Sequence, residues 1–493
     1  MFDRLVRSLG ALLAVVVVGS LPTIGACTPD VATVSGKPTP DAGQTRTGRQ
    51  DGDAGQDAGP RTGPEMETML DAGGDGLGDG PDRDATIPVD AAEADAAVPD
   101  LGFVIPRDEE GCHVIHSQEL FPTFEVTMAA EEWEALKDEW NNGSQNDSMG
   151  INPKPYHPVA QFRYDDVVIE DIFIRLRGNP TFWEPLPADK MQFQIRFRTK
   201  EKRFLGLKTL ALDAATYNRH MLRDRLGLAI LRDAGLRAPC ANHARLVVNG
   251  EYYGIFTNIE KVDKKFLGRT FIDDDGDLWK RAGWEIKTNK DIATEDRMLL
   301  LRTATTADVL GRTLDLPTAL RVFAADAVIP NSDGYWGGGL NGYLYDDPIT
   351  RKIVLIPWDL DNTFERFSHA PGGEYPVNPD PIVWEKDRTH GRPWYDLLMR
   401  DPDWHAQYIE TIREIVQDAY QPSVLHERID TWTAQIEQAV LDDQNKPYDN
   451  DLYYQKVMEL HEFVDDQHAF LEAWLACWDN GGVADDQGYC QAE

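Results

Sequence analysis

The sequence predicts an α+β protein whose first folded half is rich in β-strands and whose last part is helical. Between residues 113 and 270, short runs alternate apolar and polar residues and are separated by turn signals, a pattern typical of antiparallel hairpins. After Trp384, apolar residues recur every three to four positions, as on one face of a helix. Strands and helices are therefore segregated along the chain, which argues against a doubly wound parallel sheet.

The first 27 residues are predicted to be an export signal. Arg4 and Arg7 precede a short apolar stretch, and small residues lead to Cys27. The ending Ile24-Gly-Ala-Cys27 resembles a bacterial lipobox, in which the cysteine is lipidated, with ordinary signal-peptide cleavage nearby as the alternative. No later run reaches the roughly 18 apolar residues of a spanning helix, so a lipid is the expected membrane tether. We expect an exported protein at the outer membrane or cell surface, with the periplasmic side as the alternative.

Residues 28 to about 105 are predicted to form a disordered acidic linker. Gly, Ala, Asp, Pro and Thr dominate this segment, and no aromatic residue precedes Phe103. With 16 acidic against five basic residues, it buries too little apolar surface to offset its ordering entropy. The folded domain is therefore expected at 106–480, with a helical end from about 384, followed by a polar tail at 481–493.

The net charge indicates which partners the protein binds, and the cysteine content indicates whether it forms disulfides. A net charge of −35 without a basic stripe argues against nucleic-acid binding. Apart from Cys27, four cysteines remain, which in an exported chain allow three pairings. Cys477 and Cys490 lie close together and flank a polar segment, so we predict a disulfide between them. Cys240 reads equally well as a buried free thiol.

The elements of the first half can be placed from local patterns. "AAEEWEALKDEWNN" predicts a short amphipathic helix, and "MQFQIRFRT" predicts a strand. "VAQFRYDDVVIEDIFIRLRGN" predicts a hairpin with its turn at Asp165-Asp166. "TYNRHMLRDRLGLAILRDAGL" predicts a helix with a glycine exit. "ARLVVNGEYYGIFTNIE" predicts a second hairpin, because Asn249-Gly250 suits a primed two-residue turn.

Two long amphipathic helices are predicted at the end of the domain. Their apolar stripes are Ile429, Trp432, Ile436 and Val440 in the first, and Val457, Leu460, Val464, Leu471, Leu475 and Trp478 in the second. We interpret these stripes as core faces rather than as ligand platforms.

A strand and the turn after it carry the first candidate site residues. In "RLRGNPTF", Arg177 offers a bidentate guanidinium fork, and the backbone of Gly178-Asn179 can face phosphate oxygens. Lys190 opens the following strand, where its ammonium can reach the same anion. The alternatives are an ordinary tight loop and a solvated lysine at a strand end.

Two further segments bring acids and an amide to the ends of predicted strands. "DAVIPNSDGYWGGGLNGYLYDD" places Asp333 and Asn341 in a polar loop between a helix and a strand. "KIVLIPWDLDNTF" is a buried strand that ends at Asp359 and Asp361. Phosphoryl transfer needs one carboxylate to orient a hydroxyl, and an amide oxygen with a second carboxylate to hold magnesium.

In this order the segments resemble the CotH family, bacterial spore-coat-type proteins with an atypical protein-kinase-like fold. The matching text includes "IRLRGN", "GLKTLAL", "APCANHARLVVNGEYYGIFTNIEKVDKKFL", "NSDGYWGGGLNGYLYDD", "IPWDLDNTF" and "RPWYDLLMRDPDWHAQY", and covers about 115 to 475. The resemblance implies ATP-dependent phosphorylation of protein hydroxyls with Mg²⁺ or Mn²⁺. It implies Asp333 as the catalytic acid, Asn341 and Asp359 as metal ligands, and Asp361 nearby.

Two more residues are expected at the nucleotide. Glu260 follows the second hairpin in the matching text, and Lys280 follows a Leu-Trp pair, from which it can point into the nucleotide cleft. The chain departs from the family pattern at Pro180-Thr181, where a serine-like residue is usual. It also has a single Lys190 where the family has paired lysines.

Two other functions fit parts of the sequence. Residues 359–363, Asp-Leu-Asp-Asn-Thr, also match the nucleophile motif of haloacid-dehalogenase-type phosphatases, but that motif needs a parallel α/β domain with further strands downstream. A surface-displayed binding protein that keeps the fold without turnover is the second alternative. The segment 273–280, "DDDGDLWK", lacks the spacing of a calcium-binding loop, so we predict an acidic turn there.

Overall fold

The computed structural model describes most of the predicted domain. The described residues are 111–142, 154–178, 190–216, 218–281, 284–293, 296–339, 341–364, 379–383, 392–485 and 488–491, and all belong to one compact unit, Met69–Glu493. The export signal, the linker, Cys27 and Asn179 lie outside the described residues. In the part of the chain that is described, no helix is both long enough and apolar enough to cross a membrane.

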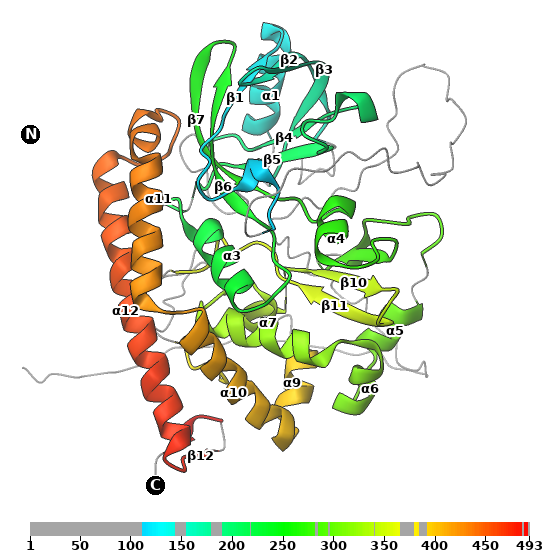
Figure 1. Ribbon diagram of the computed structural model, residues 1–493, viewed down its shortest axis with the longest axis vertical. Helices are drawn as coiled ribbons and strands as arrows, with labels where there is room; N and C mark the ends of the chain where they lie inside the picture. The colour runs from blue at the N-terminus through cyan, green and yellow to red at the C-terminus, as the bar shows by residue number, and fades with distance from the viewer. Residues whose placement is uncertain are drawn as a thin grey trace, which may run out of the picture. The chain divides into compact units, whose positions relative to one another are not determined.

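The strand-rich half closes into a barrel of seven strands, ordered β1-β2-β3-β4-β5-β7-β6 (Figure 1). All neighbours pair antiparallel except β1 and β6, whose parallel pairing completes the closure. The strands are β1 (Thr123–Thr127), β2 (His157–Tyr164), β3 (Val167–Leu176), β4 (Phe193–Arg196), β5 (Thr209–Asp213), β6 (Ala241–Val248) and β7 (Glu251–Ile259).

The two predicted hairpins are confirmed as β2–β3 and β6–β7. Asn249 and Gly250 both have positive φ, 53° and 85°, as a primed turn requires. Alternate side chains of the strands point inward and fill the barrel with aromatic rings. Phe162, for example, packs within 5.1 Å of the ring centre of Phe197 and is 0 % exposed. The barrel therefore has its own hydrophobic core.

Helix α1 (Ala130–Asn141), the first amphipathic helix predicted, packs against the barrel core through Trp133 and Leu136 and is also bonded to a histidine of β2. His157 at the start of β2 lies between two glutamates of α1, with Nδ1 at 2.8 Å from Glu132 and Nε2 at 2.8 Å from Glu139. The hydrogen bonds to Glu139 and Glu132 raise the pKa of His157, although burial opposes them.

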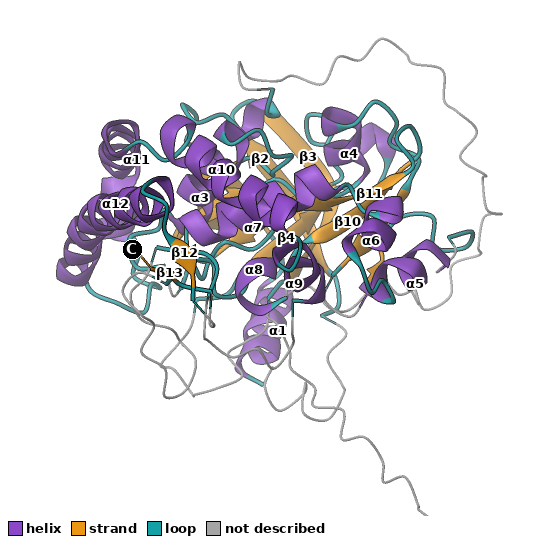
Figure 2. Ribbon diagram, turned by 90° about the horizontal axis from the view of Figure 1, so that it is seen from below, coloured by secondary structure: helices purple, strands orange, loops and turns teal. Residues whose placement is uncertain are grey.

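The middle of the chain forms a second sheet with helices around it. Strands β8 (Asp277–Lys280), β9 (Glu285–Ile286), β10 (Tyr343–Asp347) and β11 (Lys352–Ile356) follow the order β11-β10-β8-β9. The helices of this part are α3 (Arg223–Asp233), α4 (Lys264–Thr270), α5 (Asp296–Arg302), α6 (Ala307–Thr313), α7 (Leu316–Val328) and the short α8 (Tyr335–Gly338). Figure 2 shows α7 among these helices, in contact with α8 and α10.

All strand pairs of this second sheet are antiparallel. The strand that precedes Asp359, β11, pairs only with β10 within the sheet. The phosphatase alternative needs a parallel sheet that continues after its nucleophile, so among the described residues its scaffold is missing.

The end of the domain is helical, as predicted. It comprises α9 (Pro393–Met399), α10 (Pro402–Asp418), α11 (Pro422–Asp442) and α12 (Asn450–Asp479). The predicted stripe of α11 is buried throughout, and that of α12 is buried except for the partly buried Val457 and Trp478. The α+β class, with strands first and helices last, is therefore confirmed.

The four cysteines of the domain form two disulfides. Cys477 pairs with Cys490 as predicted. Cys112 pairs with Cys240, so the free-thiol interpretation of Cys240 is wrong. The first of these bridges ties β13 (Cys490–Gln491) to the end of α12, and β13 pairs with β12 (Val483–Ala484). The expected polar tail therefore contains a small hairpin.

Candidate functional site

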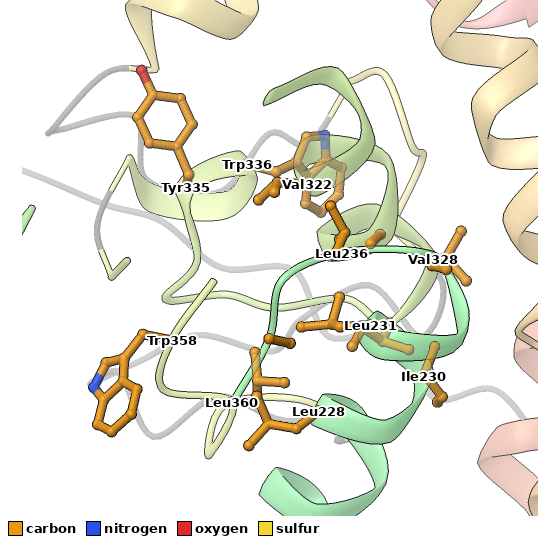
Figure 3. Close-up of a cluster of buried hydrophobic side chains, with 14 of the residues drawn as sticks. Leu228, Ile230, Leu231, Leu236, Val322, Val328, Tyr335, Trp336, Trp358 and Leu360 are labelled. Carbon is orange, nitrogen blue, oxygen red and sulfur yellow. The ribbon is translucent and has the colours of Figure 1, made fainter. Parts of the chain in front are cut away.

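The loop after β11 is anchored on α3 by one buried leucine. Leu360 is 0 % exposed and lies beside Leu228 of α3 (Figure 3). A Cβ on Gly227 would come within 2.8 Å of Leu360 Cδ1, so the absence of a side chain there permits the contact. The backbone N–H of Leu360 donates to Asp224 Oδ1 at 3.2 Å. With Leu360 fixed in the core, its neighbours Asp359 and Asp361 are held at the surface of the site.

Four aspartates from three parts of the chain influence one another there. Burial first and Asp213 second raise the pKa of Asp224 to about 7. Burial first and Asp224 second raise the pKa of Asp361 to about 8. Burial, followed by the charges of Asp361 and Asp224, raises the pKa of Asp359 well above its usual range. Such mutual repulsion is relieved when a cation binds among the carboxylates.

Three basic side chains face this acidic cluster. Arg177, at the end of β3, donates from Nη1 to Asp213 Oδ2 at 3.0 Å. Arg223 of α3 donates to the backbone carbonyl of Asp361. Lys280, at the end of β8, is nearly fully buried, and its charge opposes the rise in the pKa of Asp359. The barrel and the second sheet thus both supply cations to the same place.

The loop that carries Asp333 is held by a buried aspartate on α7. Asp326 is 2 % exposed and accepts hydrogen bonds from the backbone N–H of Trp336 at 3.3 Å and from Asn331 Nδ2 at 3.4 Å. Asn331 Oδ1 in turn accepts from the backbone N–H of Asp333 at 3.2 Å. A Cβ on Gly334 would lie 2.5 Å from Asp326 Oδ2, so glycine is required at this position.

Amide side chains join Asp333 to the predicted metal ligands. Asp333 is partly exposed, and its Oδ2 accepts from Asn341 Nδ2 and from Asn362 Nδ2, both at 3.4 Å. Asn362 Nδ2 also donates to Asp361 Oδ1 at 2.9 Å. Asn341 is 5 % exposed, and its Oδ1 is buried without a hydrogen-bond partner among the described residues. A buried amide oxygen beside these carboxylates can accept a hydrogen bond or bind a cation.

Lys190, expected at the phosphates, forms a buried ion pair instead. Its Nζ lies 2.6 Å from Asp443 Oδ2, next to the end of α11, and also donates to the carbonyl of Ile255. Burial lowers the pKa of Lys190, while Asp443 and, more weakly, Asp213 oppose that change. Lys190 is thus near the acidic cluster but is held by the helical end of the domain.

Glu260 is placed apart from the cluster. Both its carboxylate oxygens accept from Arg269, at 2.9 Å and 2.6 Å, and Oε2 also accepts from the backbone N–H of Cys240 at 3.0 Å. These bonds hold the end of β7 beside the Cys112–Cys240 disulfide. Glu260 is thus bonded to Arg269 and Cys240, and among the described residues no hydrogen bond or ion pair joins it to the four aspartates.

The acidic segment 273–275 lies in the connection between α4 and β8, in agreement with the predicted turn. Its three carboxylates each have an oxygen within 4.8 Å of the other two, close enough to share a metal ion. Among the described residues, no other group of three Asp, Glu, His or Cys side chains is this close. The predicted ligands Asp359 and Asp361 do not form such a set. Asp275 is already paired with Lys264 at 2.6 Å, as expected of a surface turn.

The sequence interpretation missed Asp213, Asp224, Arg223 and Asp326. Asp213 ends the apolar strand β5, and Asp359 comes three residues after the apolar strand β11, so a similar signal was present at Asp213. Arg223, Asp224 and Arg225 form a run of charges at the start of α3, before its apolar stretch, and all three are at most 3 % exposed. Charged residues are rarely buried without a partner or a ligand, so this run was the clearest unused signal.

Comparison with known proteins identifies the family. The family described as "CotH kinase protein" matches residues 174–471, a range that contains every predicted site residue of the domain. The chain belongs to the CotH family. It is 22 % identical over 316 residues to the "Inner spore coat protein H" of Bacillus subtilis, covering 58 % of this chain and 83 % of that protein. It is 24 % identical over 302 residues to the "Inner spore coat protein H-like protein" of the same organism, covering 59 % and 87 %.

Among solved structures, the chain is similar to the proinflammatory kinase CtkA of Helicobacter pylori. The similarity covers 58 % of this chain and 92 % of that one, at 11 % identity and a TM-score of 0.26. The CotH assignment rests on the family match.

Proposed function

We propose that this protein transfers the γ-phosphoryl group of ATP to hydroxyl groups of protein side chains, with Mg²⁺ or Mn²⁺ as the cation. The observation that supports it best is the buried Oδ1 of Asn341, which has no hydrogen-bond partner in the described part of the chain. The Nδ2 of the same amide contacts the Asp333 carboxylate, which Asn362 links to Asp361. Membership of the CotH kinase family supports a kinase-like role in general.

The residues present fit a hard divalent cation. Asn341 would supply an amide oxygen, and Asp359 and Asp361 would supply carboxylate oxygens, which are the ligands that Mg²⁺ prefers. Burial first, and the neighbouring aspartates second, raise the pKa values of Asp359 and Asp361, so a cation bound between them would favour their ionised forms. Bound there, the cation would neutralise charge on the phosphate oxygens during transfer.

Asp333 is assigned to the acceptor hydroxyl. Its carboxylate is partly exposed, and two amide groups at 3.4 Å and the Asp326–Asn331 support hold it in place. A positioned carboxylate of this kind orients a hydroxyl and accepts its proton as the oxygen attacks phosphorus.

The phosphates themselves would be met by Arg177 and Lys280. Arg177 reaches the cluster from the barrel and Lys280 from the second sheet, so an anion between these two parts would meet a cation from each. A planar guanidinium offers paired donors to phosphate oxygens, and a lysine offers a point charge. Lys190 is assigned a different role, since Asp443 already neutralises it.

The test is transfer of radiolabel from ATP by the purified full chain, with Mg²⁺, to itself and to generic acidic and basic acceptor proteins. We expect acid-stable label on serine or threonine. The absence of both nucleotide binding and label in the wild-type protein would favour the binding-protein alternative and overturn the proposal. Acid-labile label that disappears in Asp359→Asn would instead support aspartyl-phosphate chemistry.

We further propose that the protein acts at the cell envelope, tethered by lipid on Cys27, with a protein of unidentified type as substrate. The lipobox-like ending of the first 27 residues supports this proposal. Cys27→Ser should move the mature protein from the detergent phase to the aqueous phase. Unchanged partition would refute the lipid anchor and leave the proposed chemistry untouched.

A further inference from the structure

Two histidines face each other between the last two helices, away from the site described above. Helices α11 and α12 lie side by side (Figure 1), and the short connection 443–449 makes them antiparallel neighbours. His426 and Asp430 are four residues apart on α11, and His461 and Asp465 are four residues apart on α12. Each pair therefore lies on one face of its own helix.

The four side chains contact one another crosswise. His426 Nε2 lies 2.8 Å from Asp465 Oδ1 on the other helix, and His461 Nε2 lies 3.2 Å from Asp430 Oδ1. A carboxylate accepts a hydrogen bond, so each Nε2 carries the hydrogen. Each ring in its neutral form then has its lone pair on Nδ1, and the two Nδ1 atoms are only 2.6 Å apart.

The rings meet edge to edge rather than face to face. Their centres are 4.8 Å apart and their planes differ by 22°. The 4.8 Å between the ring centres is close to the sum of the 2.6 Å between the two Nδ1 atoms and the radii of the two rings. Both Nδ1 atoms therefore lie near the line that joins the ring centres. Two lone pairs directed at each other at this distance repel unless a cation lies between them.

We propose that His426 and His461 form a binding site for a divalent transition-metal ion of the Zn²⁺ or Cu²⁺ type, with Asp430 and Asp465 as outer carboxylates. Imidazole nitrogen is a preferred ligand of both ions. A carboxylate on the far ring nitrogen is the usual support of a metal-bound histidine, because it fixes the tautomer and makes the ligand more basic.

Only a small movement is needed to admit the ion. Zinc–nitrogen bonds of about 2.0–2.1 Å in a tetrahedral site place two ligand nitrogens about 3.3 Å apart, so the rings separate by less than about 1 Å. Both histidine side chains are about a quarter exposed, at 27 % and 26 %, so the rings have room to shift and water can complete the coordination. The bound ion would clamp the first half of α11 to the middle of α12.

The test is calorimetric titration of the full chain with Zn²⁺ in excess Mg²⁺, which occupies sites built from oxygen ligands. We expect the wild-type protein to bind one more Zn²⁺ than His426→Ala or His461→Ala. The matched control is His468→Ala on α12. The His468 ring lies 4.0 Å from Glu472, and no contact with a second histidine is found among the described residues. This variant should bind as the wild type does. Asp465→Asn should weaken binding about 10- to 100-fold. Zn²⁺ at a hundred times its Kd should raise Tm by a few degrees.

A second measurement needs no variant. Cu²⁺ bound to the wild-type protein should give an electron paramagnetic resonance spectrum with splitting from two imidazole nitrogens. Equal Zn²⁺ stoichiometry in the wild type and both alanine variants, or a copper spectrum without two nitrogens, would overturn the proposal. In that case the cation between the rings is a proton.

Discussion

Replacing Lys190 by methionine removes one half of an ion pair that is almost inaccessible to water. The side chains of Lys190 and Asp443 are 1 % and 0 % exposed, and their charged atoms are 2.6 Å apart. Methionine keeps much of the lysine stem, so the main loss is the positive charge. Asp443 keeps the backbone donors of Ile255, Asn445 and Lys446 but loses its buried counter-charge. The Lys446 ammonium stays nearby, on the backbone carbonyl of Asp443 rather than on its carboxylate. Removal of one partner from a buried pair costs about 3–5 kcal/mol, and we expect a loss of that size.

The reverse change, Asp443→Asn, should cost less and depend on pH. Burial already lowers the pKa of Lys190 in the wild-type protein, and Asp443 opposes that change. Without Asp443 the folded protein can release the lysine proton at a lower pH, whereas the unfolded chain holds it to about pH 10.4. Between these two pKa values the unfolded state binds more protons, so stability rises with pH. The penalty of Asp443→Asn should therefore shrink between pH 7 and 10.

Urea unfolding followed by tryptophan fluorescence measures both effects. The matched control is Lys137→Met, because Lys137 forms an exposed pair with Glu134 at 2.8 Å and should change stability by no more than about 0.5 kcal/mol. The reasoning is refuted if Lys190→Met is as mild as the control. It is also refuted if the penalty of Asp443→Asn is the same at pH 7 and pH 10.

Three further predictions test other parts of the structure. The two glutamates of α1 raise the pKa of His157, so protonated His157 stabilises the fold. This stabilisation is complete below about pH 6.5 and is lost as pH rises through the folded pKa. His157→Gln should remove this pH dependence of Tm in calorimetry. Gly334→Ala should displace the loop held by Asp326, since its Cβ would lie 2.5 Å from Oδ2, and should lower both Tm and phosphoryl transfer. The Cys112–Cys240 bridge spans 128 residues, so alkylation without reductant should leave both thiols unlabelled in intact-mass measurement, and Cys112→Ser/Cys240→Ser should lower the unfolding free energy by about 2–5 kcal/mol.

The helices and hairpins that the sequence predicted are those whose conformation depends on residues close together in the sequence. The β6–β7 hairpin follows from Asn249-Gly250, because few other residues accept positive φ at both turn positions. The long helices follow from apolar stripes whose period needs no tertiary information. Barrel closure was not predicted, because the parallel pairing of β1 with β6 joins segments over 100 residues apart, and no local pattern encodes it.

The residues of the candidate site also fall into those that local sequence predicts and those whose partners lie far away in the chain. Asp333, Asn341 and Asp361 were chosen from two short segments, and the structure joins them through amide contacts. Lys190 and Glu260 were also chosen from local context, but their partners decide what they do. Asp443 lies 253 residues from Lys190, so the sequence gives no indication of that pair.

The proposed function divides the work of phosphoryl transfer between Asp333, in the loop before β10, and Asp359, which follows β11. The most direct test compares Asp359→Asn with Asp333→Asn in Mg²⁺-dependent ATP binding and in label transfer by the same preparations. Asp359→Asn should abolish both binding and transfer, because Asp359 is assigned to the cation. Asp333→Asn should bind ATP nearly as the wild type does and lose transfer by orders of magnitude, because Asp333 orients the hydroxyl. Full transfer by Asp333→Asn, or unchanged Mg²⁺-dependent binding by Asp359→Asn, would contradict the account.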